Sequence, residues 1–263
     1  MQLAFQDTEI QLNELDEVRL ALESLNYKPK TFGIIPFVDS LSLNEQFSES
    51  TLLFGGTKLL KLKHKNLLPK NCIVYHHKET FDQYNYHRYL GYLLLNVQAQ
   101  FMPWRLVKGQ HYKMQKFIKP TSDMKFFPGF VYYPDERNVN EYLRDKVIVD
   151  CDLTDDTLVL VNHPIENIKA EYRAFVVNYK IIDITQSNAE GKLKPQRIDD
   201  TDTEESLKDF IALIQSVYEP HHSYVIDVCL VDGEYKVVEF NCINCSGLYM
   251  HDRAKIYKAL LEL

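Results

Sequence analysis

Apolar residues in the first hundred positions form one helical pattern and several short continuous runs. Over residues 7–25 they recur at helical spacing with acidic residues between them, which predicts an amphipathic surface helix. Three short apolar runs follow at residues 32–38, 51–54 and 72–75. Strands that alternate with helical segments are typical of an α/β layer, so we expect a small α/β domain in this part of the chain.

The end of this first part is marked by a helical pattern and a proline. Residues 54–58, FGGTK, lack the spacing of a phosphate-binding loop and are interpreted as a strand-to-helix turn. Residues 81–97 are rich in tyrosine and leucine and predict a helix that closes this part. Pro103 ends helical structure because its ring removes a backbone donor and restricts the preceding residue. We therefore expect two domains, which comprise residues 1–104 and residues 105–263.

Short strands separated by turns dominate the second part, a pattern typical of antiparallel sheets. The strand candidates before the first hairpin are residues 116–120, 130–133, 146–149 and 158–161. A hairpin is predicted from residues 172–177 and 181–185, which flank the short loop 178–180. Residues 201–204 fit a capping box and begin a helix, and a last helix is expected over residues 253–261.

A second hairpin carries the side chains most suggestive of chemistry. It comprises residues 224–231, the turn Asp232-Gly233 and residues 234–241. Asp227 lies on the first strand, and Glu239 and Asn241 share a face of the second because they are two residues apart. Burying a carboxylate that has neither an ion-pair partner nor a metal costs several kcal/mol of folding free energy. Two carboxylates and an amide suit Mg²⁺, so Asp227, Glu239 and Asn241 are candidate magnesium ligands.

The register of this hairpin decides whether the three side chains meet. A two-residue turn would pair Asp227 with Val238 and turn it away from Glu239. A three-residue loop ending at Glu234, with a glycine bulge, would set Asp227 opposite Glu239, and we predict this register. The structural alternative is a solvated sheet face on which the two carboxylates pair with Lys236.

A basic run precedes the hairpins. It contains one acid, Asp123, and the cations Arg105, Lys108, Lys113, Lys116, Lys119 and Lys125. Such a run could neutralise a triphosphate. The alternative is a solvated basic edge that protects a strand from aggregation.

Arg173 is the other candidate, because it lies in the apolar strand EYRAFVV on the same face as Glu171 and Phe175. Its planar guanidinium matches a carboxylate or a phosphate. The alternative is a structural ion pair with Glu171 or Asp183.

Composition excludes several classes of protein. The 263 residues carry a net charge of −7 and are 45% hydrophobic, which argues for a folded core and against general nucleic-acid binding. We expect no secretory signal and no membrane span. Five cysteines, an odd number, suit reduced thiols, so a cytoplasmic location is expected. Cys242-x-x-Cys245 has zinc-ligand spacing, but only His251 lies near it, and we set zinc aside.

Three segments taken in order resemble the ATP-grasp superfamily, and most closely its clade named for two arginines and a lysine. They are FIKPTSDMKFFPGFVYYPDE, EYRAFVVNYKIIDITQS and YVIDVCLVDGEYKVVEFNCINCSGLY. The resemblance covers residues 105–263, and residues 52–101 look like the shorter N-terminal half of that clade. It implies a small α/β domain followed by a two-lobed ATP-grasp fold with antiparallel sheets.

The resemblance also implies roles for named residues. ATP would lie between two lobes, with adenine near the linker residues Leu160, Val161 and Asn162. Phosphates would be held by Lys119 and Lys125, and Mg²⁺ by the three residues of the hairpin. Arg173 would reach the transferred phosphate or the substrate carboxylate, and Glu171 is included with it among the nucleotide-binding residues. Arg173 and Lys125 are the predicted catalytic residues.

The chain departs from the clade at two points. Lys119 stands where we expect an arginine, so one eponymous arginine is either replaced or located elsewhere, for instance at Arg197 or Arg253. The phosphate-covering loop has Phe126, Phe127 and Pro128 in place of the glycines common in the wider fold.

The implied activity is ADP-forming ligation of a small-molecule, peptide or protein carboxylate to an amine or thiol through an acylphosphate. A nucleotide-binding interaction protein without turnover and a phosphotransferase on the same fold are the alternatives. No nucleic acid and no membrane is expected as a partner.

Overall fold

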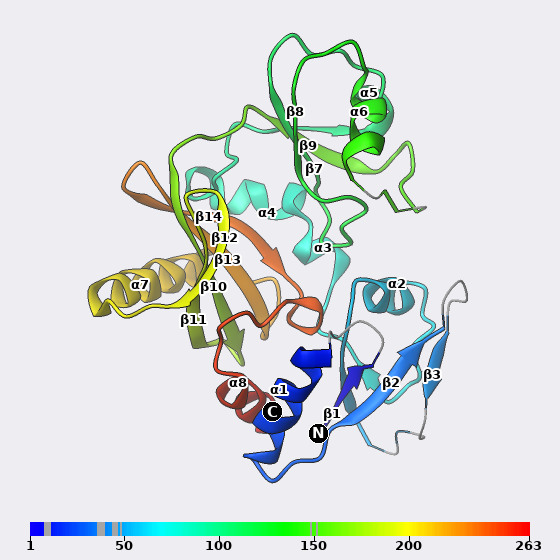
Figure 1. Ribbon diagram of the computed structural model, residues 1–263, viewed down its shortest axis with the longest axis vertical. Helices are drawn as coiled ribbons and strands as arrows, with labels where there is room; N and C mark the ends of the chain where they lie inside the picture. Colours follow the sequence, from blue (N-terminus) through cyan, green and yellow to red (C-terminus); the bar gives the residue numbers. More distant parts are fainter. Residues whose placement is uncertain (8–11, 36–39, 44–46, 48, 148, 151) are drawn as a thin grey trace.

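A computed structural model describes residues 1–7, 12–35, 40–43, 47, 49–147, 149–150 and 152–263. Within these residues the chain forms an N-terminal sheet, a small sheet and a large sheet, with helices packed around them (Figure 1). This mixed architecture confirms the predicted fold class. No helix in the described ranges is long and apolar enough to cross a membrane.

The N-terminal sheet is mostly parallel. Its strands are β1 (Gln2–Gln6), β2 (Lys30–Ile34), β3 (Leu41–Leu43), β4 (Thr51–Phe54) and β5 (Cys72–Ile73), in the order β3-β2-β1-β4-β5. Only β3 runs antiparallel to its neighbour. Helices α1 (Leu12–Glu23) and α2 (Lys58–His64) pack beside the sheet. The α/β layer expected from the alternating runs is therefore present.

Several boundaries in this layer differ from the prediction. β1 and β3 were not predicted. The run at 32–38 corresponds to β2, and residues 36–38 lie outside the described part of the chain. The predicted helix 7–25 is α1, whose first observed residue is Leu12. The FGGTK segment is confirmed as a strand-to-helix turn, since α2 begins at Lys58.

The segment predicted as one helix over residues 81–97 is broken. It contains α3 (Lys78–Phe81), α4 (Gln83–Leu90) and a 3₁₀ turn, η1 (Gly91–Leu93). Asp82 is extended and caps α4, its carboxylate accepting from the Tyr84 backbone N–H at 2.9 Å. Gly91, at φ 49°, ends α4 because this conformation is costly for other residues.

The small sheet has the order β6-β9-β7-β8 and is antiparallel. Its elements are β6 (Gln100–Pro103), α5 (Trp104–Val107), β7 (Lys116–Pro120), β8 (Phe130–Tyr132), α6 (Val139–Lys146) and β9 (Leu158–Asn162). β6, which precedes the boundary predicted at residue 104, pairs with β9, so this sheet begins at Gln100. Pro103 is tolerated because β6 is an edge strand.

The predicted strand at 146–149 is wrong. Lys146 is the last residue of α6, a helix that the prediction missed, and residue 148 lies outside the described part. A capping box starts α6: the Asn138 side chain accepts from the Glu141 backbone N–H, and the Glu141 carboxylate accepts from the Asn138 N–H, both at 3.0 Å. That spacing was the local signal for the helix.

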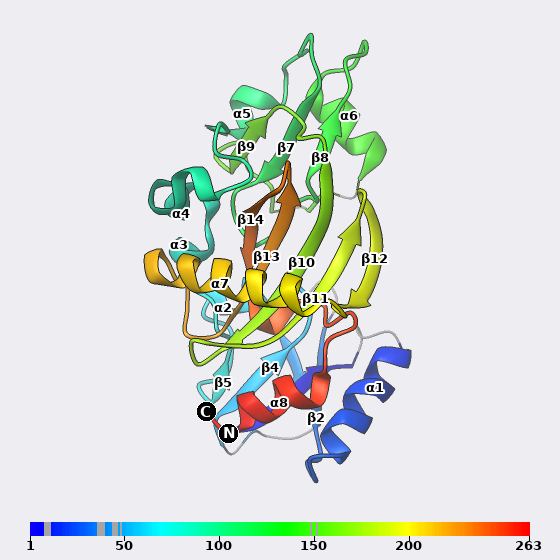
Figure 2. The same ribbon diagram turned by 90° about the vertical axis from the view of Figure 1, so that its left-hand side faces the viewer.

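The large sheet has the order β12-β11-β10-β13-β14. Its strands are β10 (Ile168–Val177), β11 (Lys180–Ala189), β12 (Lys192–Arg197), β13 (Tyr224–Val231) and β14 (Glu234–Asn241). Helix α7 (Thr201–Val217) crosses one face (Figure 2), burying Leu207, Ile211 and Ile214 against it. The 3₁₀ turn η2 (Ile243–Cys245) and helix α8 (Arg253–Leu261) follow β14. The other face packs in part against α8 through Phe175, Val177 and Val225, and it also carries Arg173 and Asp227.

Both predicted hairpins are present, with shorter turns than expected. Asn178 and Tyr179 alone, at φ 50° and 63°, join β10 to β11. Asp232 and Gly233, at φ 51° and 85°, join β13 to β14. The cap of α7 is Asp200 and not Thr201, because the Asp200 carboxylate accepts from the Thr203 backbone N–H.

The N-terminal sheet is fastened to the rest of the chain by Asn244 in η2. Its side-chain amide donates to the Leu53 carbonyl at 2.6 Å and accepts from the Tyr75 N–H at 2.8 Å. Its own carbonyl accepts from the Gly55 N–H at 2.9 Å. Buried polar groups are thereby paired across two sheets.

Aromatic and imidazole rings make a second contact between the N-terminal sheet and the rest of the chain. Tyr75, beyond β5, stacks on His221 with centroids 4.9 Å apart, and His77 lies 5.4 Å from the same ring. Burial, with the neighbouring His222 and His77, lowers the pKa of His221 to about 4. The interface therefore favours the neutral imidazole.

Acidification should weaken this interface. Because the folded pKa of His221 lies below the unfolded value, its contribution is complete above about pH 6.5 and is lost as the pH falls toward 4. Between pH 7 and pH 5 the wild-type free energy of unfolding should fall by about 1 kcal/mol more than that of His221→Phe, after allowance for partial exposure. Urea denaturation at both pH values measures this. Replacement of the exposed His111 by Gln is the control, and equal losses in all three proteins would contradict the assignment.

Candidate active site

The register of β10, β13 and β14 brings the predicted hairpin residues together. Asp227 lies opposite Glu239 on one side and opposite Arg173 on the other. The predicted pairing is therefore present, but its cause is different. The turn has two residues, and the shift comes from a bulge at Val238, which faces no residue of β13. A bulge inside a strand leaves little local signal in the sequence.

Arg173 and Asp227 form a buried bidentate ion pair. Arg173 Nε donates to Asp227 Oδ1 at 2.8 Å and Nη2 donates to Oδ2 at 2.7 Å. Burial opposes the charge of Arg173, but Asp227 more than offsets it, and the pKa of Arg173 stays above its usual value. The alternative partners considered from the sequence, Glu171 and Asp183, are not the ones it takes.

A second ion pair links the small sheet to the large one. Lys119 on β7 donates through Nζ to Glu239 Oε2 at 2.6 Å. Burial would raise the pKa of Glu239, but the charges of Lys119 and Lys125 and the bond from Lys119 lower it to about 2. Lys125 lies in the β7–β8 loop at φ 50°. Its pKa is raised, since Glu239 and Asp123 outweigh the desolvation that would lower it.

A cleft of about 240 Å³ opens between the two sheets at this point. It is lined by β7 and the loop after it, by β14, and by two rings of the α3–α4 segment; the residues are Phe81, Tyr86, Lys119, Pro120, Thr121, Ser122, Asp123, Lys125, Phe127, Pro128, Gly129, Glu239 and Phe240. Both predicted phosphate lysines therefore lie in one concave site.

Asp123 is a cleft residue to which the sequence assigned no role. It is 9% exposed, and its carboxylate accepts from the Cys242 backbone N–H at 2.8 Å. Burial raises the pKa of Asp123 to about 7. An acid inside a basic run was the available signal, but only the fold shows that it is buried beside Lys125 and Glu239.

The remaining predicted nucleotide residues lie near the cleft and do not line it. On β9, Leu160 and Val161 are buried, and Leu160 pairs in register with Lys119. The Asn162 side-chain amide donates to Asn96 Oδ1 at 3.1 Å. Glu171 accepts from Asn188 at 2.8 Å, and burial raises its pKa.

The two alternative arginines lie outside the cleft. Arg197 is exposed at the end of β12, where it pairs with Thr185. Arg253 is on α8 and forms an ion pair with Glu17.

The hairpin side chains fit a hard cation. Asn241 donates to Asp227 Oδ2 at 2.9 Å, while its own Oδ1 is buried without a hydrogen-bond partner among the described residues. An unpartnered buried oxygen beside two carboxylates is suited to a metal. Within the described ranges no three His, Cys, Asp or Glu residues form a metal cluster. The candidate donors are the carboxylates of Asp227 and Glu239 and the amide of Asn241, a set that would suit Mg²⁺ because this ion takes its other ligands from water and phosphate.

Removing one partner of the buried pair should be costly. The Asp227→Ala variant should lose about 3 kcal/mol of unfolding free energy, because it leaves the Arg173 guanidinium uncompensated. The matched control is Glu234→Ala, which breaks the pair with Lys236 on the same hairpin and should cost far less, because solvent screens the exposed Glu234 carboxylate. Urea denaturation provides both values. Similar losses for the two variants would show that the buried pair contributes no more than an exposed one.

Comparisons with known proteins concern the fold and the family. A search of curated protein sequences found no match. Several solved structures share the fold: the RimK domain protein ATP-grasp from Sphaerobacter thermophilus (14% identity, 99% of this chain and 100% of that chain, TM-score 0.61); D-alanine–D-alanine ligase from Bacillus anthracis complexed with ATP (12%, 100% and 96%, 0.56); and the ATP-grasp ligase PsnB with a phosphomimetic variant of its minimal precursor, Mg and ADP (12%, 100% and 98%, 0.53).

A family model describes most of the chain beyond the N-terminal sheet. It is the model for the ATP-grasp domain of family 2 in the clade named for two arginines and a lysine, and it matches residues 99–259, from the start of the small sheet into α8. This range contains both sheets that border the cleft and every predicted site residue. The chain therefore belongs to the second family of this clade of ATP-grasp domains.

Proposed function

We propose that this protein is an ATP-dependent ligase that joins a carboxylate to an amine through an acylphosphate. The observation that carries the proposal is the cleft where Lys119 of one sheet meets Glu239 of the other. Lys119, Lys125 and Glu239 line this cleft, and Asp227 and Asn241 lie beside Glu239 on the same hairpin. These cations, carboxylates and amide are the groups that a metal-bound triphosphate needs. Membership of the ATP-grasp family supports the same interpretation.

The proposed site residues have separate roles in binding phosphate, metal and adenine. Lys119 and Lys125 bind the phosphates as point charges, and positioning with charge neutralisation is the main source of catalysis in phosphoryl transfer. Asp227, Glu239 and Asn241 would hold Mg²⁺, which when bound neutralises charge between the phosphate oxygens. Leu160, Val161 and Asn162 on β9 are the proposed adenine contacts, and Glu171 remains a proposed nucleotide-binding residue.

Arg173 can act without leaving Asp227. A guanidinium has five N–H donors, of which two are used by Asp227, and a third, on Nη1, reaches the Gly247 carbonyl at 3.3 Å. The other two donors are sufficient to orient the substrate carboxylate or the transferred phosphoryl group. The ion pair fixes the plane of the fork, which reduces the entropy lost on binding.

The proposed reaction has two steps. A carboxylate oxygen attacks the γ-phosphorus of ATP, the bond to the β–γ bridging oxygen breaks, and ADP leaves with the electron pair. A neutral amine then attacks the acyl carbon, the bond to the phosphate oxygen breaks, and phosphate leaves with the electron pair and one amine proton. The substrate is a small-molecule, peptide or protein carboxylate. Dependence on ATP and the free state of Cys72, Cys229, Cys242 and Cys245 support a cytoplasmic location.

Nucleotide binding provides the first test. Mg²⁺ with ATP at about 100 times its Kd should stabilise the folded protein by about 2.7 kcal/mol and raise its melting temperature by several degrees. Glu239→Gln should abolish this shift, because it removes both a metal donor and the partner of Lys119. Lys236→Gln is the control on the same strand and should keep the shift. A full shift in Glu239→Gln would show that the nucleotide binds elsewhere.

Turnover tests the reaction class. ADP and phosphate should be released only when a carboxylate and an amine are both present, and release of AMP would exclude the acylphosphate route. Mass spectrometry of the product separates an amide from a phosphate ester, which a phosphotransferase would form. Binding without turnover on any substrate pair would favour the non-catalytic alternative.

A further inference from the structure

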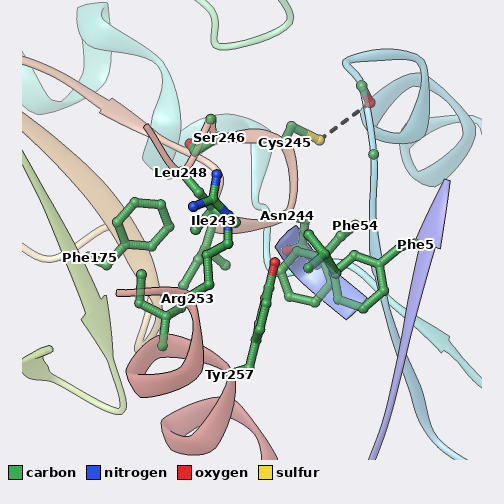
Figure 3. A pocket seen from close by; sticks show the side chains of 15 residues that line it. Phe5, Phe54, Phe175, Ile243, Asn244, Cys245, Ser246, Leu248, Arg253 and Tyr257 are labelled. Atoms are coloured by element: carbon green, nitrogen blue, oxygen red, sulfur yellow. Dashed lines mark hydrogen bonds between the residues drawn. The ribbon is translucent and has the colours of Figure 1, made fainter. Parts of the chain in front are cut away.

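A second pocket of about 230 Å³ lies where the N-terminal sheet meets the C-terminal end of the chain (Figure 3). The carboxyl ends of β1 and β4 form one wall, and η2, the loop after it and α8 form the others. This is below the roughly 300–1,000 Å³ typical of pockets for larger ligands, so its ligand is compact, on the scale of one amino acid.

One side of this pocket is a box of aromatic rings. Phe5 and Phe54 stack with centroids 5.2 Å apart, and Tyr257 stands edge-on to them at 5.4 and 6.2 Å. Phe175 lies on the other side of Arg253 in the view of Figure 3, and Leu248 adds to the apolar lining. Such a lining favours an apolar or aromatic group on the ligand.

Arg253 is the cation of the pocket. Its side chain is 16% exposed, and one nitrogen, Nη2, pairs with Glu17 Oε2 at 2.5 Å. Its Nε is buried and has no hydrogen-bond partner among the described residues. The terminal nitrogens carry further N–H donors beyond the one paired with Glu17, and these can bind a ligand that brings a carboxylate.

The pocket adjoins the proposed reaction centre through Gly247. This residue lines the pocket, and its carbonyl accepts from Arg173 Nη1 at 3.3 Å. Phe175, also in the lining, lies two residues after Arg173 on the same face of β10. A ligand held here can therefore extend one end toward the group that orients the acyl substrate.

We propose that this pocket binds a free α-amino acid with an aromatic or large aliphatic side chain, and that this amino acid is the amine substrate. The rings hold the side chain, Arg253 pairs with the carboxylate, and the amine is directed toward Gly247. This inference rests on the proposed ligase function for the fate of the amine, which attacks the acyl carbon as described above. The binding site itself rests on the pocket alone.

Calorimetric titration of the full chain with L-phenylalanine, L-phenylalaninamide and L-alanine tests the ligand class. Phenylalanine should bind saturably. The amide, which lacks the carboxylate, and alanine, which lacks the ring, should each bind at least tenfold more weakly. Absence of saturable binding of phenylalanine up to about 10 mM, or equal affinity for phenylalanine and its amide, would overturn the proposal.

Two variants test the role of Arg253. Arg253→Gln should weaken phenylalanine binding at least tenfold, whereas Lys255→Gln, on the same helix but outside the pocket, should leave it within twofold. Equal affinity of Arg253→Gln and wild type would overturn the assignment. If the variant does not fold, the comparison of phenylalanine with its amide on the wild-type protein decides the question.

The nucleotide thermal shift separates the two proposals. Phenylalanine binding together with no shift from Mg²⁺ and ATP would remove the ligase function and retain the amino-acid site. A nucleotide shift without phenylalanine binding would retain the ATP site and remove this pocket as an amino-acid site.

Discussion

Charge compensation at the junction of the two ATP-grasp sheets is the constraint on which the site depends. Arg173 and Asp227 are buried and satisfy each other, and Lys119 is paired with Glu239 across the cleft. The pair between Lys119 and Glu239 would not form if β14 followed its turn without interruption, because Glu239 would then face the α7 side of the sheet. The bulge at Val238 therefore decides where the charges lie. One unpaired residue thus places Glu239 on the same face as Arg173 and Asp227.

The N-terminal sheet is coupled to this face by a short path. Asn241 ends β14, and three residues later Asn244 bonds to the backbone of the strand β4 and of the segment after β5. The loop that continues from Asn244 carries Gly247, which contacts Arg173. Movement of the N-terminal sheet would thus be transmitted to the proposed metal donors and to Arg173. The pocket proposed for an amino acid is lined by residues of this path, Asn244 and Gly247 among them.

The sequence was most informative where local signals were strong. The strands 224–231 and 234–241 and the helix 253–261 were predicted with the observed bounds, because Asp232-Gly233 and the apolar spacing are local features. Elements whose stability depends on distant partners were missed, among them β1 and β3. The site residues were found because charges in apolar strands are conspicuous. The burial of Asp123 and the role of the bulge were not predicted, because both depend on contacts with residues more than ten positions away in the sequence.

The ion pair between Lys119 and Glu239 would compete with nucleotide binding in the cleft. A triphosphate that takes the ammonium group of Lys119 must displace the carboxylate already bonded to it at 2.6 Å. The affinity for nucleotide is therefore a difference between two ion-paired arrangements, and screening by salt weakens both of them. Ionic strength thus changes this affinity less than the number of lysines in the cleft would suggest.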